Sequence, residues 1–296
     1  MKRFTMDQQL LKAFMVVEQH RSFSQAGEEL CISQSAVSKR IHQLEQHLDI
    51  QLFERHNRSV SLTEAGTLLL PKARRILEMI QDTEQEISNS QRQVSGTLNI
   101  ATSHHIGIHR LPPFLREFVK RYPSVNLKLE FMGSERAYEA VRTRQVELAL
   151  TTLDPDQTGE FSSDNIWQDK LVCVCGTEHQ LIHRQPLTLE QLAETPAILP
   201  DATTITHQMV NEAFHKHGLK LYSPIPTNYL ETIKMMVSVG LGWSMLPESM
   251  VDESIHDLDW PAEELIRPLG VVRLAERPES NASRAFLELI NSPTFR

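Results

Sequence analysis

The sequence predicts a multidomain chain: a small helical head with a two-stranded wing, one long helix, and an α/β domain behind them. Three observations predict this fold class. Apolar residues recur at helical spacing through residues 7–48, a heptad repeat runs through residues 69–87, and short apolar strands alternate with amphipathic helices from residue 97 onward. The length of 296 residues fits about two domains better than one.

Composition excludes several classes of protein. With 40% hydrophobic and 23% charged residues and only 11 Gly, the chain has enough apolar mass for real cores and is neither fibrous nor disordered. No apolar run approaches the roughly 18 residues that a membrane span needs, and no secretory signal is present. Three Cys cannot make a disulfide framework, so we expect a protein of the reducing cytoplasm.

The net charge of -8 is distributed unevenly along the chain. Residues 1–62 hold 8 Lys and Arg against 7 Asp and Glu, which leaves 22 against 31 for the remainder. Contact between the head and nucleic acid must therefore rely on a few placed side chains rather than on a broad positive field.

The first 50 or so residues follow the order helix, short helix, turn, helix. One apolar face runs through a helix over residues 7–20. Ser24 is expected to cap a short helix over residues 26–30, and Ser33 a third helix that reaches Leu48 with a polar face at its start. This order is typical of a helix-turn-helix.

Residues 50–62 alternate apolar and polar side chains around a polar tip that contains Arg55 and Arg58. The alternation predicts a two-stranded wing. Residues 1–62 are therefore expected to form an all-α winged helix-turn-helix head.

Residues 63–96 predict a linker helix, capped by Thr63, and a hinge. A heptad stripe on this helix consists of Leu69, Ala73, Ile76, Ile80, Thr83 and Ile87. Its simplest partner is a second copy of the same helix in a dimer; the alternative is that the stripe packs on its own domain.

From residue 97 the strand-like runs are residues 98–101, 125–129, 148–150, 171–174, 197–199 and 243–246, and the helices between them include residues 111–121 and 231–239. This alternation predicts parallel βαβ units with helices on both sheet faces. Ligands of such sheets bind at the carboxyl ends of the strands.

Two sets of residues form a recognisable signature. In the head they are Ser24-Gln25-Ala26-Gly27-Glu28-Glu29-Leu30, Ser33-Gln34-Ser35-Ala36-Val37-Ser38, Ile41, Leu44-Glu45, Leu52-Phe53, Arg55, Arg58, Leu62-Thr63 and Gly66. Later in the chain they are Glu147-Leu148-Ala149-Leu150 and Gly240-Leu241-Gly242-Trp243-Ser244-Met245-Leu246-Pro247. With these residues the chain resembles the LysR-type transcriptional regulators over essentially its whole length. Gly27 departs from the family pattern, which more often has Ala there.

The resemblance implies that residues 97–296 form an effector-binding domain like a periplasmic binding protein. Its two Rossmann-like subdomains are expected at residues 97–161 with 267–296 (subdomain I) and at residues 162–266 (subdomain II). The resemblance also implies a homodimer and, as a dimer of dimers, a homotetramer.

The family motif assigns DNA contact to the start of the third helix and to the wing. The DNA-binding residues expected are Ser33, Gln34, Ser35, Ser38, Lys39, Arg55 and Arg58. The alternatives are a merely solvated helix face and, for Arg55, a structural ion pair.

Polar residues that follow strands or precede helices of the α/β domain predict an effector site. They are Ser103, His104, Ser134, Thr151, Thr152, Thr203, Thr204 and Asn228. Each could instead be a simple helix cap. Because no Lys or Arg falls among them, we expect a small polar or anionic effector held by hydroxyls, helix dipoles and a protonated His rather than by a guanidinium.

A redox- or metal-responsive regulator is the alternative function. Cys173 and Cys175 share one face of a strand and are either a redox sensor or buried apolar filler. His104, His105 and His109 suggest a metal, but no carboxylate or Cys accompanies them at ligand spacing, so we expect no metal site.

The sequence lacks a Gly-rich phosphate loop, a Gly-x-Ser-x-Gly elbow and a His-Glu-x-x-His motif, so no catalytic residues are expected and the chain is not an enzyme. We expect a sequence-specific DNA-binding regulator with no cofactor beyond a small-molecule effector. Its expected partners are double-stranded operator DNA, the effector, further copies of itself and RNA polymerase, and no membrane.

Overall fold

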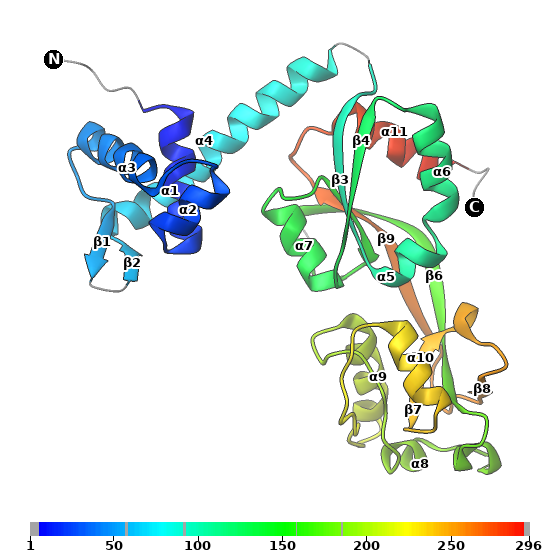
Figure 1. Cartoon of the computed structure of the whole chain (residues 1–296). Helices are drawn as coiled ribbons and strands as arrows, with labels where there is room; N and C mark the ends of the chain where they lie inside the picture. Colours follow the sequence, from blue (N-terminus) through cyan, green and yellow to red (C-terminus); the bar gives the residue numbers. More distant parts are fainter. Residues whose placement is uncertain (1–5, 57–58, 91–92, 158, 185, 293–296) are drawn as a thin grey trace. The chain divides into compact units, whose positions relative to one another are not determined.

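The computed structural model describes residues 6–56, 59–90, 93–157, 159–184 and 186–292. The chain forms two compact units, residues 1–91 and residues 92–296 (Figure 1). The prediction of a helical helix-turn-helix head followed by an α/β domain is confirmed.

Three helices build the head. They are α1 (Gln8–His20), α2 (Phe23–Glu29) and α3 (Gln34–Leu48), and their apolar faces meet in one core around Phe14, Val37 and Ile41. The predicted capping of α2 by Ser24 is wrong: Ser22 caps it, because its hydroxyl accepts a hydrogen bond from the backbone N–H of Gln25 at 3.3 Å.

The wing consists of β1 (Phe53–His56) and β2 (Ser59–Leu62), which pair antiparallel. Glu45 fixes where the wing begins, since its Oε1 accepts a hydrogen bond from the backbone N–H of Leu52 at 2.8 Å. Gly66 then lets the following helix approach closely, because a Cβ there would lie 2.2 Å from the carbonyl oxygen of Leu52.

Helix α4 (Glu64–Asn89) is capped by Thr63 as predicted. The first part of its heptad stripe is taken up by its own head, where Leu69 packs against the core and Ala73 is fully buried. The later part is left without such cover: Ile76 is 37% exposed and Ile87 65%. The stripe therefore packs on its own head at one end, as the alternative predicted, and leaves an exposed apolar face at the other.

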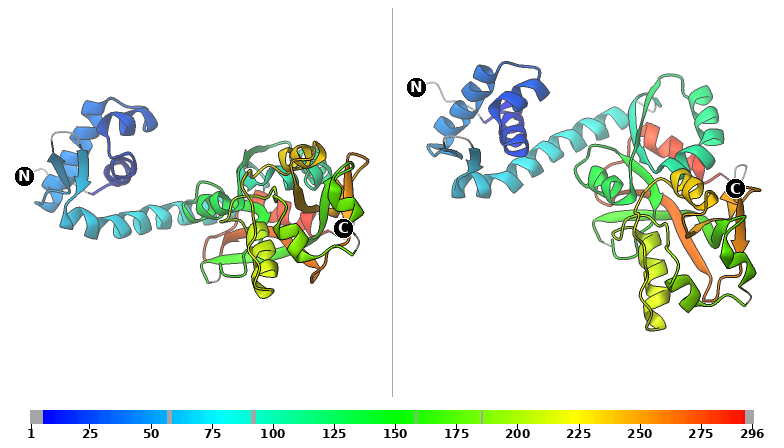
Figure 2. Two further views of the ribbon diagram at one scale, coloured as in Figure 1. Left: turned by 90° about the horizontal axis from the view of Figure 1, so that it is seen from below. Right: turned by 60° about the horizontal axis from the view of Figure 1, so that its bottom comes forward.

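A mixed, curled sheet forms the centre of the second unit (Figures 1 and 2). Its strands are β3 (Gly96–Thr102), β4 (Val125–Phe131), β5 (Leu148–Thr152), β6 (Phe161–Gly176), β7 (Trp243–Pro247), β8 (Ile255–Leu258) and β9 (Leu265–Leu274). Along the sheet the order is β4-β3-β5-β9-β6-β7, and β8 also pairs with β6.

Among the strands that the structure describes, β4, β3 and β5 pair parallel and the other pairs are antiparallel, so the prediction of parallel units throughout is wrong. Strand β9 runs antiparallel to both β5 and β6, because it returns from one subdomain to the other. The predicted strand at residues 197–199 is only an isolated bridge from Ala197 to Trp243.

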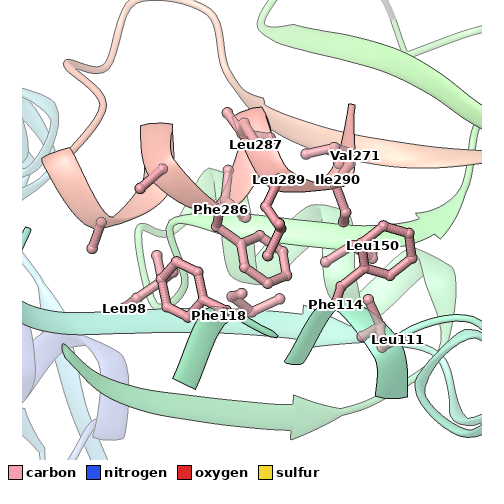
Figure 3. Close-up of a cluster of buried hydrophobic side chains, with 14 of the residues drawn as sticks. Leu98, Leu111, Phe114, Phe118, Leu150, Val271, Phe286, Leu287, Leu289 and Ile290 are labelled. Carbon is pink, nitrogen blue, oxygen red and sulfur yellow. The ribbon is translucent and has the colours of Figure 1, made fainter. Parts of the chain in front are cut away.

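Helices cover both faces of the sheet in each subdomain. In subdomain I, α6 (Pro112–Arg121) and α11 (Asn281–Ile290) pack on one face through Phe118 and Phe286, whose rings lie 5.2 Å apart (Figure 3). Helix α7 (Ser134–Arg142) covers the other face. A short helix, α5 (His104–His109), follows β3 directly.

In subdomain II, α8 (Leu189–Ala193) and α9 (Ile205–Lys216) cover one face and α10 (Leu230–Ser238) the other. Two 3₁₀ turns, Gln180–His183 and Glu248–Met250, complete it. The two subdomains thus have separate cores and share the strands β6 and β9, which run side by side from one into the other (Figure 1).

Candidate functional site

The start of α3 presents a polar surface. Ser33 caps the helix, its Oγ accepting a hydrogen bond from the backbone N–H of Ala36 at 3.2 Å. Beside it Gln34, Ser35 and Lys39 are exposed and Ser38 is half-buried. The apolar face that anchors the helix, Val37, Ile41 and Leu44, is fully buried on the opposite side.

This surface offers what recognition of a DNA groove needs. An amide, several hydroxyls and an ammonium group stand at the free end of a rigid helix, where they can reach base edges and phosphate oxygens. Because the helix follows a turn from α2, the geometry is that of a recognition helix. Of the two wing arginines, the backbone of Arg55 lies in β1, whereas its side chain and all of Arg58 lie outside the described residues.

A cavity of about 370 Å³ lies between the two subdomains of the second unit. Six of the eight predicted effector residues line it: Ser103, His104, Ser134, Thr152, Thr204 and Asn228. They come from strand ends and helix starts, as the polar pattern predicted. The other two do not line it: Thr151 is buried within β5, and Thr203 is exposed.

Several of these cavity residues also act as helix caps, the role that the alternative interpretation gave them. Ser103 Oγ accepts a hydrogen bond from the backbone N–H of Ile106, and Thr204 caps α9. Asn228 accepts a hydrogen bond from the backbone N–H of Asp201 at 2.9 Å and donates one to its carboxylate at 2.6 Å. The polar wall of the cavity is therefore held in place by local hydrogen bonds.

The expectation that no guanidinium serves this site is wrong. Arg267 and Arg136 both line the cavity. Arg136 is exposed, whereas Arg267 is only 6% exposed and its Nε has no hydrogen-bond partner among the described residues. Arg267 lies on β9, far in sequence from the strand ends used for the prediction. It reaches the cavity because β9 runs beside β6 from one subdomain to the other.

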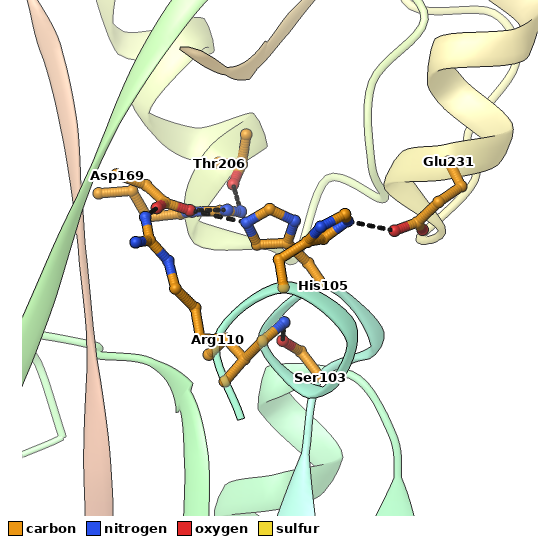
Figure 4. Close-up of polar contacts among 9 residues, drawn as sticks. Ser103, His105, Arg110, Asp169, Thr206 and Glu231 are labelled. Atoms are coloured by element: carbon orange, nitrogen blue, oxygen red, sulfur yellow. Dashed lines mark hydrogen bonds and ion pairs between the residues drawn. The ribbon is translucent and has the colours of Figure 1, made fainter. Parts of the chain in front are cut away.

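A buried polar cluster is centred on Asp169 (Figure 4), and Arg267 belongs to it through a hydrogen bond to the carboxylate. Asp169 and Arg267 are opposite each other on β6 and β9, and Arg267 Nη2 donates to Asp169 Oδ2 at 2.9 Å. Arg110 Nη2 donates to the other carboxylate oxygen at 2.8 Å, and His105 Nε2 lies 3.1 Å from Oδ2. Arg267 also donates to Thr206 Oγ1 at 3.1 Å.

This cluster joins parts of both subdomains to the crossing strands. His105 and Arg110 come from α5 and its end, and Thr206 comes from α9. Burial alone would raise the pKa of Asp169, but the hydrogen bond from His105, the charge of Arg267 and the hydrogen bonds from both arginines hold it well below its usual range. Two guanidinium groups thus meet one ionised carboxylate, which leaves an excess positive charge beside the cavity.

The two cysteines of β6 do not have the properties of redox sensors. Cys173 and Cys175 are both fully buried in the core under α8 and α9. Burial raises the pKa of the Cys175 thiol to about 11 and that of Cys173 well above its usual value. Since the thiolate is the reactive form, these features favour the interpretation as apolar filler.

The structure separates the three neighbouring histidines. The ring of His104 lies against Phe131 and Tyr229, with centroids 5.1 and 4.8 Å away. The rings of His105 and His109 are 5.0 Å apart on another side of α5. There a carboxylate joins them: His109 Nε2 lies 3.4 Å from Glu231 Oε1 of α10.

A helix-turn-helix with a polar recognition surface, followed by a two-subdomain α/β unit with a polar cavity, defines a ligand-responsive class of DNA-binding regulator. Sequence profiles agree: "Bacterial regulatory helix-turn-helix protein, lysR family" matches residues 8–67, and "LysR substrate binding domain" matches residues 91–292. The chain belongs to the LysR family of transcriptional regulators. It is a regulator with an effector-binding domain and not an enzyme.

Among its relatives, the uncharacterized HTH-type transcriptional regulator YeiE of Escherichia coli K12 is 30% identical over 94% of this chain and 94% of its own length. A probable RuBisCO transcriptional regulator of Cyanidium caldarium is 28% identical over 98% and 96%. Over 108 residues, 36% of this chain and 75% of the relative, a regulator of Azotobacter vinelandii is 56% identical.

Solved structures share the fold. A full-length OxyR variant from Pseudomonas aeruginosa aligns with a TM-score of 0.67 at 21% identity, over 97% of this chain and 93% of that one. Full-length CbnR in complex with its target DNA aligns with a TM-score of 0.60 at 20% identity, over 96% and 99%.

Among the described residues, no helix is both long and apolar enough to span a membrane.

We expect Asp169→Asn to lower the free energy of unfolding of the second unit by about 3–5 kcal/mol, because it leaves buried guanidinium groups without their carboxylate. Urea denaturation of the full chain followed by tryptophan fluorescence measures this, since Trp167, Trp243 and Trp260 all lie in that unit. Because the pKa of folded Asp169 is lowered, its contribution is present above about pH 4 and is lost as the pH falls further.

Asp164→Asn is the matched control. Asp164 also lies on β6 and pairs with an arginine of β9, Arg273, but its side chain is 40% exposed. An exposed pair contributes about 0–1 kcal/mol, so this change should be nearly neutral. Equal losses in the two variants would contradict a special role for the buried cluster.

Proposed function

We propose that the protein is a sequence-specific regulator whose DNA binding is modulated by a small polar or anionic effector held between the two effector subdomains. The cavity next to Arg267 carries this proposal. It is a concave space of about 370 Å³ lined by both polar and apolar groups, with a buried guanidinium in its wall whose Nε lacks a partner among the described residues. Such an unsatisfied buried donor is rare and costly unless something else satisfies it.

Charge favours an anion within this chemical class. The Asp169 cluster has one positive charge in excess, and Arg136 adds an exposed cation at the rim. The start of the 12-residue helix α9 also faces the cavity through Thr204 and Ile205, and a helix N-terminus favours negative charge. Glu135 also lines the cavity, and its negative charge repels anions, most strongly those of high charge.

The effector can act through the crossing strands. Residues of both subdomains line the cavity, and among the described residues only β6 and β9 run through both cores. A ligand that contacts both walls binds one arrangement of the subdomains better than another and so shifts the equilibrium between them. The bulge of β6 between Asn165 and Trp167 lies in this shared segment and is the point where its pairing with β9 changes register.

For the head we propose that Ser33, Gln34, Ser35, Ser38 and Lys39 contact the operator from α3, with Arg55 and Arg58 reaching it from the wing. The exposed polar start of α3 supports this. A bacterial regulator that meets double-stranded DNA works in the cytoplasm, and RNA polymerase is its further partner.

We propose that the open part of the α4 stripe pairs with a second copy of the chain, and that two such dimers form the tetramer. On this part of the stripe Ile76 is 37% and Ile87 65% exposed, and neither belongs to the core of its own unit among the described residues. An apolar face of this length is costly in water and is typical of a helix that pairs in a coiled coil.

We expect Gln34→Ala to weaken binding to the operator by about 1–3 kcal/mol, because one base contact is lost, and to leave non-specific DNA binding nearly unchanged. Fluorescence anisotropy with operator and scrambled duplexes at fixed salt measures both. Gln46→Ala is the control: the same residue type is exposed on the same helix, near its other end. If Gln34→Ala binds the operator like the parent, α3 does not read bases through this residue.

We expect Ile80→Glu to halve the sedimenting mass of the full chain, because it places two like charges in the proposed helix pair. Gln81→Glu adds the same charge one position away, off the stripe, and should leave the mass unchanged. Analytical ultracentrifugation compares the two variants with the parent. An unchanged mass for Ile80→Glu would remove this stripe from the interface.

Adjacent threonines test the cavity. An anionic ligand is first found by a thermal-shift screen of inorganic anions and small carboxylates. Thr204→Ala, which changes the cavity wall, should then lower the affinity for that ligand roughly 10- to 100-fold, because one hydrogen bond to a charged group is lost. Thr203→Ala, exposed and outside the wall, should leave it unchanged in calorimetric titration. Equal affinities in the two variants place the ligand elsewhere.

A further inference from the structure

We infer that His105, His109 and Glu231 form a binding site for a divalent transition-metal ion, bridging the two effector subdomains. The three side chains offer one ligand atom each, and these atoms lie within 4.8 Å of one another. His105 and His109 are four positions apart on α5 of subdomain I, and Glu231 lies on α10 of subdomain II. This inference does not depend on the proposed effector or on DNA binding.

The donor set suits zinc and related ions. Two imidazoles and one carboxylate are the protein ligands of many zinc sites that keep a fourth position open for water or substrate. Two ligands of a tetrahedral zinc ion lie about 3.3–3.4 Å apart. His109 Nε2 and Glu231 Oε1 are 3.4 Å apart, so this pair already has the spacing that a shared ion requires.

His105 supplies an independent observation. Its side chain is 4% exposed, and its Nδ1 is buried with no hydrogen-bond partner among the described residues. Its other nitrogen, Nε2, faces the buried carboxylate of Asp169 at 3.1 Å, so the ring stands between Asp169 and the Glu231 side (Figure 4). When Nε2 carries the proton and donates it to Asp169, Nδ1 presents a lone pair.

This arrangement matches the usual support of a metal-bound histidine. A carboxylate that accepts a hydrogen bond from one ring nitrogen fixes the tautomer and makes the other nitrogen a better ligand. Asp169 is in turn held by Arg110 and Arg267, so the ring of His105 is oriented before any ion arrives. The cost of burying an unpartnered Nδ1 is offset once it binds a cation.

Access and neighbouring charge allow an ion to enter. The side chains of His109 and Glu231 are 40% and 42% exposed, so they can rotate inward while the fourth position stays open to water. Of the cations nearby, Lys234 on α10 is paired with Asp252 at 2.6 Å, and Arg110 and Arg267 share the carboxylate of Asp169. An ion bound by all three ligands joins α5 to α10 and stabilises the arrangement of subdomains in which they approach.

The test measures Zn²⁺ binding to the purified full chain after chelator treatment, by competition with a chromophoric chelator. We expect one tight ion per chain, and a visible spectrum of tetrahedral type when Co²⁺ replaces Zn²⁺. Glu231→Gln and His109→Gln, both at exposed positions that should not disturb folding, are each expected to weaken binding by at least about 10- to 100-fold, since loss of an outer-shell partner alone costs that much.

The double variant Glu212→Gln, His215→Gln is the matched control, because it removes an exposed Glu and an exposed His from helix α9. It should keep the tight site, and excess Mg²⁺ should not compete in any variant, since Mg²⁺ prefers oxygen ligands. Zinc that binds equally to the parent and to Glu231→Gln overturns the inference. So does a parent chain that binds no zinc at micromolar free ion.

Discussion

The buried ion pair of Asp169 and Arg267 is the interaction on which the effector unit depends. It lies where β6 and β9 pass together from one subdomain to the other, and each partner is directly opposite the other in the sheet. Either charge alone would be prohibitive at this burial. His105 of α5 and Arg110 at its end also hydrogen-bond to the carboxylate, and Thr206 of α9 accepts a hydrogen bond from the guanidinium, whose Nε stays without a partner among the described residues. The pair therefore ties the cavity walls of both subdomains to β6 and β9.

This arrangement brings three features of the unit together at one point. Among the described residues, β6 and β9 are the strands common to both cores, the cavity opens beside Arg267, and the His105 ring lies between the cluster and the pair His109 and Glu231. A ligand that binds to Arg267 Nε or to His105 Nδ1 would act directly on the segment of β6 and β9 that joins the two subdomains. Signals of two kinds, an anion and a metal ion, could thus converge on one conformational equilibrium.

Local patterns predicted the head and many strand ends well, because capping and amphipathicity depend on residues three or four positions apart. Ser33 caps α3, and Ser103 and Thr204 cap helices beside the cavity. The cap of α2 was misplaced by two positions, since Ser22 and Ser24 are equally good candidates in the sequence. Six of the eight predicted effector residues line the cavity, because they were chosen at strand ends and helix starts and these ends meet there.

The sequence by itself determined the class of the chain and the polar start of its recognition helix, which follow from periodicity and motif. For Cys173 and Cys175 it left a redox sensor and buried filler open, and the structure favours the second. Only the tertiary structure decided which distant charges meet. Arg267 joins Asp169 from 98 positions away, and Glu231 joins His105 and His109 from another subdomain. No spacing rule could show either, because contacts across a sheet or a cleft depend on strand order and on the return path of β9, which a periodic pattern does not encode.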